Sequence, residues 1–259
     1  MANKGILIVG HGSRSGSNEP AVEMHAKYLR DRGYDNVYHS FKGYSKPYVQ
    51  DVIEDMVSAG IDEVIVVPMF IARGHYANDV VPRRVGLQKG DTEGTAVICG
   101  REVRVRITDA FGYHRMLPDT ILKMAGEHEV GGKKNAVLLI GHGSKGGENK
   151  NMVMSNAEAV GNAGKRVYAA FNEFNDPAVE DALSEMGRDG IEHIVAIPLF
   201  VSSGEHTDKD LPAKLGLDGS GSRGSADRCG RTMSVTYTAP IGTRPEVGEI
   251  IESMVGEYF

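Results

Sequence analysis

The stretch that decides the fold is AVLLIGHGSKGGEN at residues 136–149, and a near-copy, GILIVGHGSRSGSN, lies at residues 5–18. Each begins as a short apolar run that stops on Gly-His-Gly-Ser. Such a run is typical of a buried parallel strand that leads through a loop into a helix. The histidines, His11 and His142, would then follow the carboxyl ends of central strands, where open α/β sheets bind their ligands.

The recurrence of this motif predicts a chain built from two similar units. The 259 residues divide into repeats over residues 1–130 and 135–259, joined by the polar linker EVGGKKN at residues 129–135. Within each repeat, apolar runs alternate with helical patterns in the order β-α-β-α-β-loop-β-α. This order predicts an α/β fold with two flavodoxin-like units, each with a parallel sheet flanked by helices. The Gly- and Ser-rich segment at residues 218–231 is predicted to be a surface loop.

Composition excludes several classes of protein. A net charge of −6 argues against a nucleic-acid partner, and no apolar run is long enough to span a membrane. The N-terminus lacks the pattern of a signal peptide, and two cysteines in 259 residues favour a reducing environment. We therefore expect a cytoplasmic protein without a membrane partner.

Four histidines in loops that leave parallel strands form the candidate site. They are His11 and His75 in the first repeat, and His142 and His206 in the second. Neutral imidazoles suit Co²⁺, Ni²⁺, Fe²⁺ and Zn²⁺, although single histidines are often structural or solvated. The sequence lacks the ligand pattern of a closed zinc site, the lysine of a P-loop and the Gly-x-Ser-x-Gly of a hydrolase. These absences favour an open, transient metal site.

Three segments together resemble the class II chelatases, specifically the sirohydrochlorin cobaltochelatase and nickelchelatase family. They are VLLIGHGSKGG, AFNEFNDPAVEDAL and IPLFVSSGEHTDKDLPAKLGL, which occur in this order in the second repeat. The resemblance implies an ATP-independent enzyme that inserts Co²⁺ or Ni²⁺ into sirohydrochlorin for cobalamin or nickel-tetrapyrrole biosynthesis. It implies a divalent metal (Co²⁺, Ni²⁺ or Fe²⁺) as substrate, no tightly bound cofactor, and a monomer that forms an internal pseudo-dimer. A ferrochelatase for sirohaem and a non-catalytic metal or tetrapyrrole carrier are the alternatives.

The resemblance also assigns roles to individual residues. His142 and His11 would be catalytic, and His142, His206, His11 and His75 would bind the metal. The first repeat has Gly43 at the position of Glu173, and its second histidine is shifted by one residue relative to the second repeat. The expected substrate-binding residues are Glu173, Leu199, Phe200, Val201, Ser202, Ser203 and Gly204.

Overall fold

The chain forms two compact units in the computed structural model, which describes residues 2–14, 16–217 and 221–259. Unit 1 consists of Met1–His114 and Pro245–Phe259, and unit 2 consists of Arg115–Arg244. The units therefore differ from the predicted repeats, 1–130 and 135–259, in the placement of one helix each. Helix α4 (Leu117–His128) ends the first repeat but belongs to unit 2, and α8 (Pro245–Gly256) ends the second repeat but belongs to unit 1.

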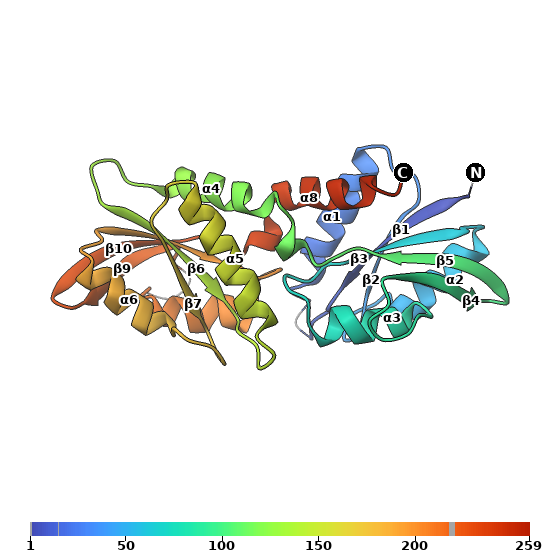
Figure 1. Cartoon of the computed structure of the whole chain (residues 1–259), viewed down its shortest axis with the longest axis horizontal. Coiled ribbons are helices and arrows are strands. Elements are labelled where there is room, and N and C mark those ends of the chain that lie inside the picture. Colours follow the sequence, from blue (N-terminus) through green and yellow to red (C-terminus); the bar gives the residue numbers. More distant parts are fainter. Residues whose placement is uncertain (1, 15, 218–220) are drawn as a thin grey trace. The chain divides into compact units, whose positions relative to one another are not determined.

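Unit 1 is a five-stranded sheet with the strand order β2-β1-β3-β5-β4. Its neighbouring strands are parallel, except that β4 runs antiparallel to β5. Helix α2 packs on one face, where its apolar side chains share a core with those of β1 and β3. Helices α1 and α8 lie side by side (Figure 1) and contact β1, β2 and β3. The bounds are β1 (Lys4–Gly10), α1 (Glu19–Asp31), β2 (Val37–Phe41), α2 (Val49–Ser58), β3 (Glu63–Pro68), α3 (Val81–Arg84), β4 (Glu93–Ile98) and β5 (Arg101–Ile107).

Unit 2 repeats this architecture with the strand order β7-β6-β8-β10-β9. Strand β6 pairs in parallel with β7 and β8, and β9 runs antiparallel to β10. Helix α6 contributes to the core on one face, while α4 and α5 contact each other and the strands β6, β7 and β8. The bounds are β6 (Asn135–Gly141), α5 (Glu148–Asn162), β7 (Val167–Phe171), α6 (Val179–Arg188), β8 (His193–Pro198), α7 (Leu211–Lys214), β9 (Arg223–Arg228) and β10 (Arg231–Tyr237).

Four short helical turns complete the two units. The π-helices η1 (Tyr76–Val80) and η3 (His206–Asp210) follow β3 and β8 and lead into α3 and α7. The 3₁₀ turns η2 (Phe111–Tyr113) and η4 (Ile241–Thr243) follow β5 and β10. π-Helices are rare and concentrate at functional sites. The positions of η1 and η3 are therefore consistent with a functional role for the loops that carry the predicted histidines.

The predicted α/β fold is confirmed, but the predicted order of four strands per unit omits both antiparallel edge strands, β4 and β9. The segment at residues 218–231 was predicted to be a loop, but Arg223–Arg228 forms the antiparallel edge strand β9; residues 218–220 lie outside the described residues. The side chains of β9 alternate around a single buried apolar residue, Ala226. A single buried apolar residue does not produce a recognisable alternation of apolar and polar residues. The edge strand is short and only one of its faces is covered, so few of its residues need to be apolar.

Two further observations concern the whole chain. None of the helices in the described part of the chain combines the length and the apolar character that crossing a membrane requires. Both cysteines, Cys99 and Cys229, are free and exposed. They occupy equivalent turns between the antiparallel strands, with φ of 50° and 53°.

Candidate metal and substrate site

His142 is held in the loop that leaves the central strand β6. The strand is buried from Ala136 to Gly141 because β7 and β8 flank it and helices α5 and α6 cover the two faces of the sheet. Gly143 then turns the chain with φ of +89°, and a Cβ at this position would lie 1.9 Å from the carbonyl oxygen of Glu173. Only glycine allows this close approach of two backbones. The motif therefore needs its second glycine to bring the His142 loop against the loop that follows β7.

Glu173 is carried by that second loop, and backbone hydrogen bonds join the two loops. The amide of Asn172 donates to the carbonyl oxygen of Gly141, and the amide of Glu173 donates to that of His142, both at 2.9 Å. The amide of Ser144 donates to Oδ1 of Asn175 at 2.8 Å. The exposed Glu173 carboxylate thus stands on the same backbone frame as the His142 ring.

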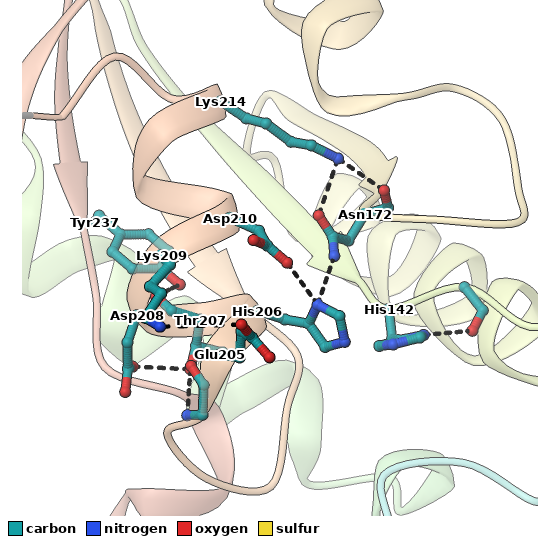
Figure 2. Close-up of polar contacts among 12 residues, drawn as sticks. His142, Asn172, Glu205, His206, Thr207, Asp208, Lys209, Asp210, Lys214 and Tyr237 are labelled. Carbon is teal, nitrogen blue, oxygen red and sulfur yellow. Dashed lines mark hydrogen bonds and ion pairs between the residues drawn. The ribbon is translucent and has the colours of Figure 1, made fainter.

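His206 begins the π-helix η3, which follows the next parallel strand, β8. The buried hydroxyl of Tyr237 donates to the carbonyl oxygen of Thr207 at 2.9 Å, and the amide of Gly204 donates to the Thr207 hydroxyl at 2.8 Å. Burial, with the nearby Asp208 carboxylate, raises the pKa of Tyr237 far above its ordinary value, so its hydroxyl stays a donor. These bonds fix the turn from which the His206 ring projects toward His142 (Figure 2).

The three loops bring one group of metal-ligating side chains together. Ligand atoms of His142, Glu173 and His206 all lie within 4.8 Å of one another. The two imidazoles meet edge to face, with ring centroids 4.7 Å apart. In the described part of the chain, no other three side chains of His, Cys, Asp or Glu meet in this way. Two imidazoles and one carboxylate can hold a first-row divalent ion and leave coordination positions open.

Hydrogen bonds at Nδ1 leave Nε2 of both histidines as the free ligand atom. Nδ1 of His142 donates to the carbonyl oxygen of Gly143 at 3.1 Å. Nδ1 of His206 lies 2.7 Å from Oδ2 of Asp210 and 3.2 Å from Nδ2 of Asn172. The carboxylate can only accept, and its contact is the shorter, so Nδ1 of His206 carries the proton and donates to Asp210. Each Nε2 therefore presents a lone pair, which is the arrangement that metal-binding histidines use.

Aromatic and basic side chains surround the three ligands. The ring of Phe174 stacks 5.9 Å from that of His142, is 56% exposed, and has Nζ of Lys145 5.9 Å from its centroid. Lys214 donates to the backbone oxygen and Oδ1 of Asn172 at 2.7 and 2.9 Å. An exposed aromatic face beside a metal-ligating group suits a flat apolar ligand, and the ammonium groups suit its anionic substituents.

Most of the predicted substrate-binding segment is accessible in unit 2. Phe200, Val201, Ser202 and Gly204 are partly exposed and Ser203 is exposed. The Phe200 ring lies 6.1 Å from the ring of His142. Leu199 departs from the prediction, because its side chain is fully buried and cannot contact a ligand.

In the first repeat the structure does not place His75 against His11. The ring that meets His11 edge to face, at 4.8 Å, belongs to Tyr76. His75 is largely exposed, and its Nδ1 lies 3.5 Å from Asp79. The physical reason is that η1 begins at Tyr76, which therefore takes the position that His206 has at the start of η3. Burial lowers the pKa of His11, and the Lys42 ammonium lowers it further against the opposing bond to Gly12.

Three residues of the unit 2 site were missed by the sequence reasoning. Asp210 orients His206, Asn172 contacts both His206 and Lys214, and Phe174 stacks on His142. The four-residue spacing between His206 and Asp210 is the signal that could have identified that pair, since residues four apart on a helical turn are neighbours. No comparable sequence signal identifies Asn172 or Phe174.

Comparisons with known proteins show the family and the fold to which the chain is similar. A family model described as CbiX matches residues 5–127 and again residues 136–258. A protein from Halobacterium salinarum named "Probable sirohydrochlorin cobaltochelatase" is 31% identical over 80% of this chain and 75% of its own length. A "Sirohydrochlorin cobaltochelatase" from Saccharolobus solfataricus is 33% identical over 48% of this chain and 94% of its own length. The structure of SirB from Bacillus subtilis with Fe³⁺ has the same fold, with a TM-score of 0.75 at 20% identity, covering 98% of this chain and 95% of that one.

Proposed function

The chain belongs to the CbiX family, and from this premise we propose that it inserts Co²⁺ into sirohydrochlorin without using a nucleotide. The observation that carries the proposal is the group His142, Glu173 and His206, with the free Nε2 atoms of its two histidines. The relatives that bear the name sirohydrochlorin cobaltochelatase support both the metal and the tetrapyrrole.

The three ligands are suited to hold a metal for a short time and then release it. Two imidazoles and a carboxylate leave at least one coordination position of a four-coordinate ion for water or for a pyrrole nitrogen. Glu173 and Phe174 are exposed, so a macrocycle can approach the ion from solvent. The same donors accept Ni²⁺ and Fe²⁺, which makes these ions the natural competitors of Co²⁺.

His142 has a second role as the base of the reaction. Metal insertion forms four metal–nitrogen bonds and releases the two pyrrole N–H protons, so each turnover must discharge two protons. The Nε2 lone pair of His142 becomes available as the metal passes to the ring and accepts one of the two protons, and the other proton passes to solvent water. The bond from Nδ1 to Gly143 keeps the ring in the orientation that presents Nε2.

We also propose that one polypeptide is the functional species and that it is cytoplasmic. The Saccharolobus relative corresponds to about half of this chain, which supports the view that the two repeats stand for two copies of a shorter chain. His11 would serve the reaction only as a counterpart of His142, because Gly43 and Tyr76 replace the two partners that Glu173 and His206 provide.

The test is an absorption assay with the purified full chain, sirohydrochlorin and Co²⁺. We expect the visible spectrum to change faster than without protein, and His142→Ala and His206→Ala to lose the acceleration. His75→Ala is the matched control, since this exposed histidine lies outside the group, and it should retain activity. Equal rates with and without protein would refute the proposal, whereas tight binding of the macrocycle without turnover would identify a carrier. Parallel assays with Ni²⁺ and Fe²⁺ rank the metals.

A further inference from the structure

The loops of unit 1 repeat the backbone frame of the unit 2 site. Gly12 has φ of +74°, and a Cβ there would lie 2.0 Å from the carbonyl oxygen of Gly43, as a Cβ at Gly143 would from Glu173. The amide of Lys42 donates to the carbonyl oxygen of Gly10 at 3.0 Å, as that of Asn172 does to Gly141. Unit 1 therefore has a preorganised loop cluster with the same frame and different side chains.

A cation lies among the side chains of this cluster. Lys42 is the counterpart of Asn172, and its Nζ lies 3.6 Å from the ring centroid of Tyr76 and 5.6 Å from that of Tyr44. The Tyr76 ring contacts His11, as His206 contacts His142 in unit 2. The Lys42 ammonium is thus held between aromatic faces on the frame that carries metal ligands in the second repeat.

The cluster carries two cations, and the acid beside its loops, Glu19, accepts hydrogen bonds from the hydroxyls of Ser13 and Ser45. Within the described residues, neither Lys42 nor Arg14, whose guanidinium lies 5.4 Å from the Tyr44 ring, forms an ion pair with a carboxylate. Gly43 supplies no carboxylate where unit 2 has Glu173. An ammonium without a carboxylate repels a divalent cation and attracts an anion.

We propose that this cluster of unit 1, made of His11, Arg14, Lys42, Tyr44 and Tyr76, is a metal-independent binding site for a carboxylate on a flat aromatic ligand. Lys42 pairs with the carboxylate, and Arg14 adds a second positive charge. Tyr44 is 60% exposed, so its ring offers area to the body of the ligand, whereas the Tyr76 ring lies against Lys42 and Phe70 and holds the ammonium in place. The identification of this ligand with sirohydrochlorin, a polycarboxylate macrocycle, rests on the proposed function.

The first experiment measures the affinity of the full chain for sirohydrochlorin in the absence of metal. Lys42→Met keeps an unbranched side chain but removes the charge, and we expect it to weaken binding roughly 10- to 100-fold, the usual range for a charge-assisted hydrogen bond. Lys42→Arg should retain most of the affinity, which excludes a general folding defect. Lys27→Met is the control, because Lys27 is an exposed lysine of the same unit, paired with Asp31.

Two outcomes of this experiment decide the proposal when sirohydrochlorin binds. Weaker binding by Lys42→Met, with unchanged affinity for Co²⁺ alone, supports the anion site, since the metal ligands lie in unit 2. Equal affinity of wild type and Lys42→Met for sirohydrochlorin overturns it.

A second probe separates this proposal from the proposed function. Benzenehexacarboxylate is a flat polycarboxylate that cannot take a metal into a ring, and its binding is followed by the NMR shifts of the Lys42 and Tyr44 amides. If the wild type binds no sirohydrochlorin, the proposed function fails. Shifts with benzenehexacarboxylate that disappear in Lys42→Met would then still support the anion site, and the absence of such shifts would overturn it.

Discussion

At the scale of single residues, Asp210 decides which nitrogen of His206 is free. Its carboxylate accepts the Nδ1 proton at 2.7 Å, which directs the Nε2 lone pair toward His142 and Glu173. The same bond fixes the orientation of the imidazole ring. Asp210 therefore supports metal binding without being one of the three ligands.

We predict that Asp210→Asn weakens Co²⁺ binding about 10- to 100-fold, the range typical of lost partners of metal-binding histidines. The amide can still accept from Nδ1, but it lacks the charge, and it can turn its NH₂ group toward the ring and favour the wrong tautomer. Cobalt titration of the metal-free protein measures the effect. Asp208→Asn is the matched control on the same turn, and equal losses in the two variants would contradict this role for Asp210.

The same scale shows where sequence reasoning succeeds and where it fails. His142, Glu173 and His206 follow strands that end at one edge of a parallel sheet, so their approach could be predicted from the strand order alone. His75 directly follows Gly74, whereas His206 lies two residues after Gly204, so the sequence places Tyr76, and not His75, at the position of His206. The helices η1 and η3 begin at these equivalent positions. The contact between the Tyr76 ring and His11 depends on tertiary packing, which a single sequence does not reveal.

At the scale of elements, a buried histidine joins the end of α4 to the sheet of unit 2. His193, at the start of β8, is 2% exposed; its Nε2 donates to the carbonyl oxygen of His128 at 3.0 Å, and its Nδ1 lies 2.8 Å from the Ser234 hydroxyl. Burial lowers the pKa of His193 below its ordinary value of 6.5, and the Lys133 and Arg223 charges act in the same direction, against the bond to His128. The folded protein therefore favours the neutral ring.

This pKa predicts the pH dependence of stability. Because the folded pKa is lowered, the unfolded chain binds the proton more readily, so the contribution of His193 is complete above pH 6.5 and is lost as the pH falls through and below that value. His193→Gln keeps hydrogen-bonding groups but cannot be protonated. We expect its free energy of unfolding, measured by urea titration between pH 7.5 and 5, to fall less steeply than that of the wild type. Parallel curves would show that another group carries the dependence.

The sheet edges illustrate the limit of pattern reasoning for elements. The central strands β1, β3, β6 and β8 are continuous apolar runs and are evident in the sequence. The edge strands β4 and β9 bury few side chains, and β9 reads RGSADR, a polar sequence whose strand conformation comes from pairing with β10. Hydrogen bonding to a neighbour, rather than side-chain burial, determines these strands, so their own residues give little indication of them.

At the scale of the whole molecule, the boundaries of the two sequence repeats differ from those of the two compact units. The last helix of the first repeat, α4, belongs to unit 2, and the last helix of the second repeat, α8, belongs to unit 1. The apolar face of α8 is evident from its periodicity, with Val247, Ile250 and Ile251 buried. Periodicity indicates that a helix must be covered, but not which sheet covers it. Burying each large apolar side chain contributes about 1.5–3 kcal/mol, so these three alone supply several kcal/mol to unit 1. The stability of unit 1 therefore depends on residues that the sequence assigns to the second repeat.

Gly248 provides a direct test of the assignment of α8 to unit 1. A Cβ at Gly248 would lie 2.8 Å from Cγ of Tyr28 on α1, whereas a Cβ at Gly126 on α4 would meet nothing within 4 Å. We predict that Gly248→Val destabilises unit 1 by about 1–3 kcal/mol through overpacking, while Gly126→Val changes stability little. Hydrogen exchange should show faster opening of β1, α1 and β3 in Gly248→Val, with β6 and β8 protected as in the wild type. Faster hydrogen exchange in β6 and β8 instead would mean that α8 stabilises unit 2, which would contradict its assignment to unit 1.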